Sequence, residues 1–246
     1  TDNWFVSVSG DDPLPDMFLG RIAVRTQTEL DAIVAKMVSY EENVPVDGWS
    51  QNVLLVADNE PLFEDVSDRL AQDYLGDYNA NKVYLSSYPN TGAATEAIID
   101  YIDAGAILTN YTGHGNIDKW ASERIFQSSD VASLNNPDRL SFVMALDCLN
   151  GWFSYHKGDY TLADEFLRAA QKGAIGVWAP TGLGYTSQNN ILARELFNDL
   201  FIEKEIDLGV LTTGAKISAV VNYGVSTDNL EIFTLFGEPT TWLQLD

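Results

Sequence analysis

One cysteine and one histidine have side chains that could together make and break a covalent bond. Cys148 is the only cysteine among 246 residues, and it follows the apolar residues 141–146. His114, one of two histidines, stands between two glycines shortly after a second apolar run, residues 106–110. A thiolate is a strong nucleophile, and an imidazole can take up and return its proton near neutral pH. The pair predicts a cysteine hydrolase in which Cys148 attacks and His114 is the general base and acid.

Acyl transfer also needs groups that stabilise the developing oxyanion and orient the imidazole. The main-chain N–H groups of Gly115 and Cys148 are the candidates for the oxyanion hole, because glycine at 115 lets a substrate approach the backbone closely. Asp58 follows the apolar residues 53–57 and is the candidate for orienting His114. Glu60 competes for that role from two positions further on, and both acids could instead belong to a solvated loop.

Several aromatic residues and one acid lie near the expected active edge of the sheet. Trp120, Trp152, Tyr185 and Asp147 are the candidates for contacting substrate, although core packing is the alternative for the aromatic residues. The second histidine, His156, lies in a polar segment and is expected at the rim or on the surface.

Strand-like and helix-like segments alternate along most of the chain, which favours parallel strands joined by crossover helices. We expect one α/β sheet with helices on both faces, and no linker divides the chain, although residues 43–52 are the best candidate for a sub-boundary. Asp58, His114 and Cys148 each fall at the carboxyl end of a predicted strand, where such sheets bind ligands. The predicted strands are residues 4–8, 19–24, 53–57, 82–85, 106–110, 141–146, 174–179 and 240–245, and the predicted helices are residues 28–41, 63–74, 91–104, 130–134, 162–172, 188–201 and 209–223.

The composition narrows the classes of partner. Thirty-six acidic and 14 basic residues give a formal net charge of −22, which repels nucleic acid and anionic membranes and attracts cationic substrates or divalent ions. No apolar run approaches the ~20 residues that a membrane helix needs. The acidic residues of the loop 10–16 make calcium binding plausible, whereas the chemistry proposed above requires no cofactor.

Two motifs of the chain resemble the gingipain family of cysteine peptidases, within the wider caspase-like group. They are Asn-Tyr-Thr-Gly-His-Gly-Asn at residues 110–116, with Trp120 beyond it, and Leu-Asp-Cys-Leu-Asn-Gly at residues 146–151. The 34 positions between His114 and Cys148 are similar to the family's spacing, and residues 18–22 and 233–239 also resemble family segments. The resemblance covers most of the chain.

The resemblance implies a caspase-like three-layer sandwich and a cysteine endopeptidase with His114 and Cys148 as the catalytic pair. It also implies an acidic third member that falls on Asp58, with Glu60 still possible. The family cleaves after Arg or Lys and binds calcium structurally. No single residue here matches the family's acidic pocket residue, and residues 180–185 depart from its pattern.

The resemblance also suggests a secreted or cell-surface protein made as a longer precursor, in which residues 1–42 could be the tail of a preceding subdomain. A non-enzymatic peptidase-like scaffold within a surface or secretion protein is the main alternative function. An α/β-hydrolase-type esterase is disfavoured, because that fold places its nucleophile before its histidine in the chain.

Overall fold

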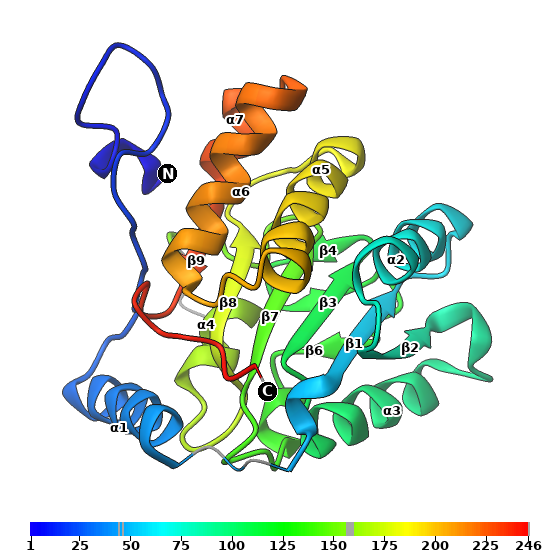
Figure 1. Ribbon diagram of the computed structural model, residues 1–246. Coiled ribbons are helices and arrows are strands. Elements are labelled where there is room, and N and C mark those ends of the chain that lie inside the picture. The colour runs from blue at the N-terminus through cyan, green and yellow to red at the C-terminus, as the bar shows by residue number, and fades with distance from the viewer. Residues whose placement is uncertain (44, 46, 156–159, 246) are drawn as a thin grey trace.

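The computed structural model describes residues 1–43, 45, 47–155 and 160–245. Its centre is a six-stranded sheet in the order β2-β1-β3-β7-β8-β9, parallel except for β9 (Figure 1). The strands β1, β3, β7 and β8 are buried along almost their whole length, as expected for a sheet covered on both faces. Their bounds are β1 Asn52–Ala57, β2 Asn79–Tyr84, β3 Leu108–Thr112, β7 Ser141–Leu146, β8 Ala174–Pro180 and β9 Phe233–Phe236.

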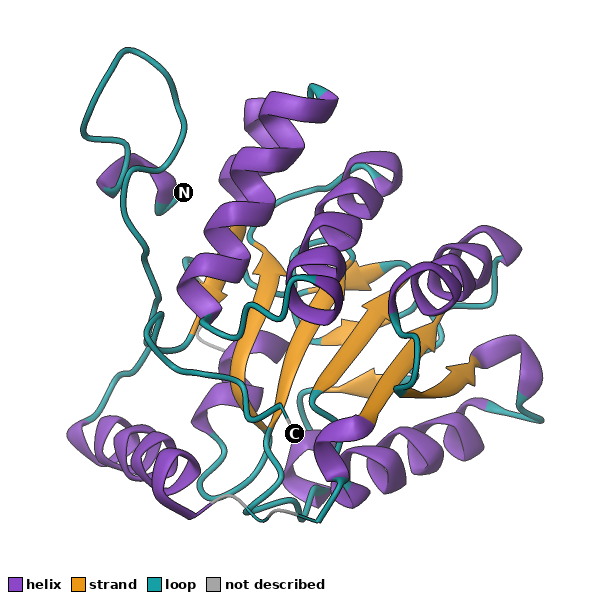
Figure 2. Ribbon diagram, viewed as in Figure 1, coloured by secondary structure: helices purple, strands orange, loops and turns teal. Residues whose placement is uncertain are grey.

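Helices cover both faces of this sheet and make a three-layer sandwich (Figure 2). One layer holds α1 (Gln27–Asn43), α3 (Thr91–Ala104) and α4 (Leu162–Arg168), and the other holds α2 (Pro61–Tyr74), α5 (Thr186–Phe197) and α6 (Leu208–Tyr223), with the short α7 (Thr227–Ile232) beside α6. The predicted fold class, a mostly parallel α/β sandwich, is therefore confirmed.

Local sequence signals explain several helix ends. Asn90 caps α3 through its side chain, which accepts a hydrogen bond from Ala93 N, and Gly105 ends the helix with a φ of 98°. Thr161 and Asp164 form a reciprocal capping box at the start of α4. These caps fix where the chain turns back into β3 and towards β8.

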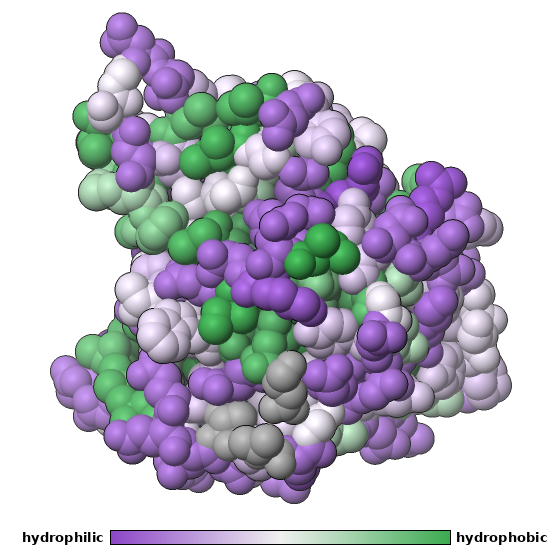
Figure 3. Space-filling model, viewed as in Figure 1, coloured by the Kyte–Doolittle hydropathy of each residue, from purple (hydrophilic) through white to green (hydrophobic). Residues whose placement is uncertain are grey.

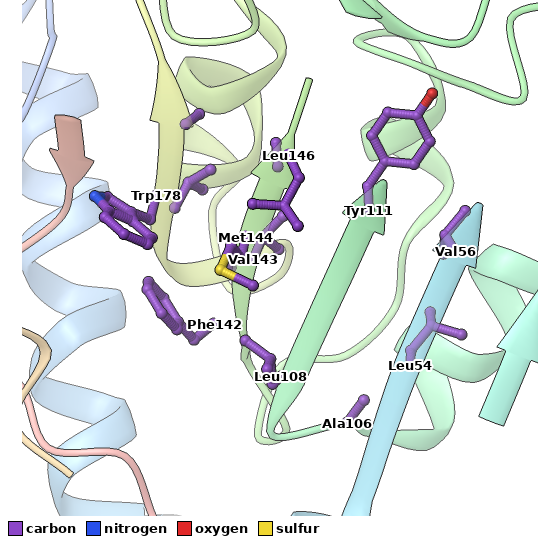
Figure 4. Close-up of a cluster of buried hydrophobic side chains, with 14 of the residues drawn as sticks. Leu54, Val56, Ala106, Leu108, Tyr111, Phe142, Val143, Met144, Leu146 and Trp178 are labelled. Carbon is purple, nitrogen blue, oxygen red and sulfur yellow. The ribbon is translucent and has the colours of Figure 1, made fainter. Parts of the chain in front are cut away.

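The core is one continuous set of apolar side chains between the sheet and the two helix layers. Figure 4 shows part of it, with Leu108 on β3 and Phe142 and Met144 on the neighbouring β7. The face with α2, α5 and α6 is hydrophilic over α2, and hydrophobic residues gather near α6 and α7 (Figure 3). Within the described ranges, no helix combines the length and apolar character that crossing a membrane requires.

Three predicted strands at the ends of the chain do not form. Residues 4–8 begin within a 3-10 helix, Asn3–Phe5, and residues 19–24 contribute only an isolated bridge from Arg21 to Phe236. The strand expected at residues 240–245 is replaced by β9, earlier in the chain. The edge position beside β8 can pair only one strand, and Phe233–Phe236 occupies it in antiparallel register.

Candidate active site

Two loops leave the sheet side by side where β3 and β7 end. Thr112 and Leu146 are paired positions in the parallel register, and Gly113 N donates to Leu146 O at 3.4 Å. His114 and Cys148 each follow their paired position by two residues. Because the strands are parallel neighbours, this equal offset brings the imidazole loop and the thiol loop to the same edge of the sheet.

The direction in which successive strands are added to the sheet reverses between β1 and β3. The chain passes from β1 outward to β2 and then returns to β3 on the other side of β1. Open α/β sheets bind ligands in the crevice at such a switch point. Asp58 follows β1 and His114 follows β3, so both residues flank that crevice.

Glycine at position 115 allows the two loops to touch. A Cβ added at Gly115 would lie 2.0 Å from Asp147 Oδ2, so any larger side chain would separate the loops. Asp147 is 2% exposed, and neither carboxylate oxygen has a hydrogen-bond partner among the described residues. Burial raises the pKa of Asp147 well above its usual value, which favours a neutral carboxyl group there.

The thiol of Cys148 is partly buried. Its Sγ donates a long hydrogen bond to Gly184 O at 3.8 Å. Burial raises the pKa of the Cys148 thiol. Leu149, the next residue, has a φ of 68°, a left-handed conformation that is uncommon for a residue with a side chain. The chain thus turns sharply directly after the nucleophile candidate.

The ring of His114 is mostly exposed and lies against two residues of the β1–α2 region. Its Nε2 is 3.2 Å from Glu60 Oε1, and the ring meets Phe63 edge-on with centroids 5.3 Å apart. Nε2 thus contacts Glu60, and Sγ of Cys148 contacts Gly184 O; no hydrogen bond joins the two side chains in the described part of the chain.

Asp58 supports the backbone of the histidine loop rather than the ring. It is 1% exposed, and its two oxygens accept hydrogen bonds from Asn59 N at 2.8 Å and His114 N at 3.2 Å. Burial raises the pKa of Asp58, while these two N–H groups lower it. Of the two acids considered for orienting the imidazole, the structure places Glu60 at the ring and Asp58 beneath the main chain.

Tyr111 holds the same loop from the side of β3. Its hydroxyl, which extends beyond the end of β3 in Figure 4, donates to His114 O at 2.5 Å and accepts from Ala121 N at 2.9 Å. Trp120 stacks on the Tyr111 ring with centroids 4.7 Å apart. The small sheet β4 (Gly115–Asn116), β5 (Lys119–Trp120) and β6 (Phe126–Gln127) therefore begins directly after His114 and is anchored to β3.

Comparisons with known proteins agree with this geometry. Residues 1–244 match the sequence profile of peptidase family C25. The chain belongs to peptidase family C25.

Within this family, the chain is similar to gingipains in sequence and in structure. Gingipain R2 of Porphyromonas gingivalis is 26% identical across 98% of this chain and 34% of its own length. Lys-gingipain of the same organism is 25% identical across 71% of this chain and 10% of its own length. The crystal structure of the Arg-specific cysteine proteinase gingipain R superposes with a TM-score of 0.86 and 25% identity, covering 99% of this chain and 59% of that one. The chain thus spans about a third of the Gingipain R2 sequence.

Two of the predicted substrate contacts of this C25 chain are buried. Trp120 is 1% exposed between Tyr111 and the aromatic residues behind it, and Asp147 is 2% exposed under the two loops. Neither side chain faces an open surface, because aromatic rings pack around Trp120 and the main chain at Gly115 lies against Asp147. Both residues therefore support the loops from below.

The other predicted contacts remain accessible. Tyr185 is 66% exposed and directly follows Gly184, the partner of the thiol. Trp152 is partly exposed, and its Nε1 donates to Ser154 Oγ at 3.1 Å. His156 lies outside the described residues, so its predicted rim position stays a prediction.

Carboxylates of the acidic loop 10–16 accept hydrogen bonds from main-chain N–H groups of the same region. Asp16 Oδ2 accepts from Val8 N at 2.7 Å and Ser9 N at 2.8 Å, and Asp12 Oδ1 accepts from Leu14 N at 2.9 Å. These carboxylates serve their own loop, and no group of three or more His, Cys, Asp or Glu residues is placed to hold a metal anywhere in the described ranges. Calcium binding by this chain stays an untested prediction.

The sequence analysis predicted no role at the site for four residues that contact its parts in the structure, which are Phe63, Tyr111, Asn150 and Gly184. Tyr111 and Asn150 carried a visible signal, because each lies within one of the two motifs, residues 110–116 and 146–151. The part played by Gly184 comes from its carbonyl oxygen, which every residue type has, so no sequence signal could have shown it.

Proposed function

We propose that the chain is the catalytic part of a cysteine endopeptidase, with Cys148 as nucleophile and His114 as general base and acid. The observation that carries this proposal is the register of β3 and β7, which sets His114 and Cys148 at equal offsets on adjacent loops. Membership of peptidase family C25 supports it from an independent direction.

Glu60 is proposed as the residue that orients the imidazole. An Nε2–H that donates to Glu60 Oε1 leaves Nδ1 unprotonated, so Nδ1 accepts the thiol proton. The Glu60 carboxylate also stabilises the imidazolium that forms when the proton arrives. Asp58 contributes indirectly, because it holds the main chain of His114 in place.

Peptide hydrolysis then takes two steps. The Sγ–H proton passes to His114 Nδ1 as sulfur bonds to the carbonyl carbon, and the carbonyl π pair moves onto oxygen. Main-chain N–H groups of Cys148 and Gly115 stabilise that oxyanion. Its collapse expels the amine, which takes the proton from Nδ1 and leaves a thioester. Water, deprotonated by His114, attacks the thioester and releases the acid and the thiol.

Preference for Arg or Lys at P1 is proposed as well. Two relatives support it by name, one as an Arg-specific proteinase and one as Lys-gingipain. The exposed Glu60 and the net charge of −22 would favour a cationic side chain near the site. Matched peptides with Arg, Lys, Gln or Ala at P1 test this, and equal kcat/KM for all four would reject it.

The catalytic proposal is tested by peptide cleavage with wild-type protein and the Cys148→Ala and His114→Ala variants. We expect both variants to lose at least about 1,000-fold in kcat, since the dyad acts as a unit. Full activity of Cys148→Ala would end the proposal. A wild-type protein that neither cleaves peptides nor reacts with a Lys or Arg chloromethylketone would favour the non-enzymatic scaffold instead.

Secretion or display at the cell surface is proposed from the resemblance to gingipains. One of the structures that share this fold is described as a complex of pro- and mature domains, which supports a processed precursor there. Fractionation of the producing cells tests it, and recovery of the protein only in the cytoplasm would contradict it.

A further inference from the structure

The side chain of Asn150 bridges the two loops that carry Cys148 and His114. Asn150 lies two residues after Cys148 and is 1% exposed. Its amide nitrogen donates to Asn116 O and to Lys119 O, the latter at 3.2 Å. Both carbonyls belong to the β4–β5 hairpin, which begins directly after His114. One amide group thus links the loop of the thiol to the hairpin that continues the loop of the imidazole.

The two carbonyls define a specific place on the hairpin. Asn116 and Lys119 are paired positions at the closed end of β4 and β5, so their oxygens lie on either side of a two-residue turn. The two N–H groups of an amide point in different directions and can reach both oxygens, whereas a carboxylate or an alkyl group can donate to neither. The recognition therefore depends on the amide nitrogen.

The main chain of Asn150 is fixed at the same time. Its carbonyl accepts a hydrogen bond from Ala163 N at 3.2 Å, in the first turn of α4. The residues on either side are held by β8 and the segment after it, because Leu149 N donates to Gly182 O at 3.1 Å and Gly151 N donates to Pro180 O at 2.9 Å. The amide therefore extends from a rigid base, and a change in its length or chemistry moves the hairpin rather than the thiol loop.

One atom of the same side chain has no partner. Asn150 Oδ1 is buried without a hydrogen bond in the described part of the chain, and such an atom is unfavourable for stability. The amide therefore contributes through its nitrogen, which makes both of its hydrogen bonds to the hairpin.

We propose that Asn150 is a positioning residue that sets the separation between Cys148 Sγ and the His114 imidazole. This inference depends on the proposed peptidase function, because the separation matters only if the two groups exchange a proton. Asn150 touches no reacting atom in the proposed mechanism. A displacement of about 1 Å in such a pair can reduce the rate by about 100-fold.

Asn136 provides a matched control at the other end of β7. It is also 1% exposed, and its amide nitrogen donates to Gly173 O at 2.9 Å and Arg139 O at 3.3 Å. Its side chain lies before β7, whereas Asn150 lies after it. Replacement of either asparagine by alanine removes two hydrogen bonds to carbonyls, and Asn136→Ala also removes the one that Oδ1 accepts from Gly173 N at 2.9 Å. Only Asn150→Ala affects the loops that carry Cys148 and His114.

The experiment compares Asn150→Ala, Asn150→Ser, Asn136→Ala and His114→Ala with wild type. Thermal unfolding, kcat and KM are measured, together with the rate of Cys148 alkylation by iodoacetamide from pH 5 to 10. We expect both Asn→Ala variants to unfold at lower temperature. Asn150→Ala should lower kcat about 10- to 100-fold with KM changed less than threefold, and Asn136→Ala should retain kcat within about twofold.

The alkylation profile separates positioning from general loss of structure. His114→Ala should shift its inflection to higher pH, because the thiol loses its base, and Asn150→Ala should shift it in the same direction while Asn136→Ala does not. Asn150→Ser keeps one donor, so its kcat and its alkylation inflection should lie between those of wild type and Asn150→Ala. This variant is used for the comparison if Asn150→Ala fails to fold.

Two different results identify two different failures. A folded Asn150→Ala or Asn150→Ser protein with wild-type kcat and an unshifted alkylation profile would overturn the positioning role. Peptide cleavage that survives Cys148→Ala would instead overturn the peptidase proposal. If the wild type cleaves no peptide, the alkylation profiles alone test the positioning role. The inference is then rejected if the profile of Asn150→Ala matches that of wild type rather than that of His114→Ala.

Discussion

Glu60 Oε1 lies 3.2 Å from His114 Nε2, while the neighbouring acid Asp58 accepts a hydrogen bond from the main-chain N–H of His114. Two carboxylates two residues apart therefore contact different parts of the same histidine. Glu60 immediately precedes α2 and extends to the exposed ring, whereas Asp58 is buried at the end of β1. This division of contacts leads to different expectations for the two residues.

Neutralising each acid should affect a different property. Glu60→Gln should lower kcat about 10- to 100-fold with little change in the unfolding temperature, because its side chain is 45% exposed and acts on the ring. Asp58→Asn should lower the free energy of unfolding by about 1–3 kcal/mol, because one of the two main-chain N–H groups loses its acceptor. Steady-state kinetics and urea unfolding of both variants check this. The reverse pattern would assign the orienting role to Asp58.

Asp147 should make stability depend on pH. Burial raises its pKa in the folded state, so above about pH 4 the unfolded chain loses this proton more readily than the native protein does. The contribution of Asp147 to stability is fully present below the unfolded pKa and is lost as pH rises towards the folded pKa. Asp147→Asn, which cannot ionise, should become progressively more stable than wild type between pH 4 and 8.

Urea unfolding at pH 4, 6 and 8 measures this difference. The advantage of Asp147→Asn should grow by about 1.4 kcal/mol per pH unit until the folded pKa is reached. A difference between the two proteins that stays constant with pH would show that Asp147 ionises normally in the native state.

Gly115→Ala should separate the two catalytic loops. The added Cβ would lie 2.0 Å from Asp147 Oδ2 and 2.4 Å from Asp147 Cγ, so one loop must move. We expect a loss of at least about 100-fold in kcat, since the reacting groups are displaced. The double variant Gly115→Ala/Asp147→Ala should recover part of this loss, because the smaller side chain makes room for the methyl group.

A glycine in α6 gives the control for this pair of variants. A Cβ at Gly214 would come no closer than 3.4 Å, to Asp199 Oδ2, so Gly214→Ala should be neutral or stabilise the helix by up to about 1 kcal/mol. Wild-type kcat in Gly115→Ala would mean that the loops tolerate a wider separation than the contact with Asp147 implies.

Lys36 should be important for the attachment of α1 to the rest of the fold. Its Nζ is buried within hydrogen-bond distance of four carbonyl oxygens, those of Phe166 at 3.3 Å, Leu167 at 2.6 Å, Ala169 at 3.0 Å and Lys172 at 3.1 Å, and its three N–H groups are shared among them. Burial lowers the pKa of Lys36 to about 7. These carbonyls lie at and beyond the end of α4, where helix carbonyls have no partners of their own. Lys36→Met should therefore lower the free energy of unfolding by about 2–4 kcal/mol.

An exposed lysine provides the comparison. Lys204 donates to Tyr78 OH at 3.1 Å, so Lys204→Met should change the free energy of unfolding by less than about 0.5 kcal/mol. Thermal or urea unfolding of the two variants distinguishes them. Equal stability of Lys36→Met and wild type would show that α1 is held without these hydrogen bonds.

The sequence by itself determined the central architecture and the two residues proposed for catalysis. The apolar runs before Asp58, His114 and Cys148 are buried strands, because only side chains that tolerate burial on both faces can fill the middle of a parallel sheet. The end segments were harder to predict. Residues 4–8 and 240–245 alternate like strands, but a strand forms only where a neighbour supplies hydrogen-bond partners, and β9 takes the available edge.

Tertiary structure alone decided how the acids, Trp120 and Asn150 are used. Spacing along the chain places Asp58 and Glu60 equally near His114, and only the path from β1 into α2 decides which carboxylate reaches the ring. The sequence is equally consistent with Trp120 in a cleft wall or in the core, and only the packing of the β4–β5 hairpin on β3 shows that it is buried. The link from Asn150 to that hairpin joins residues more than 30 positions apart, and contacts of that kind depend on the strand register, which no local pattern specifies.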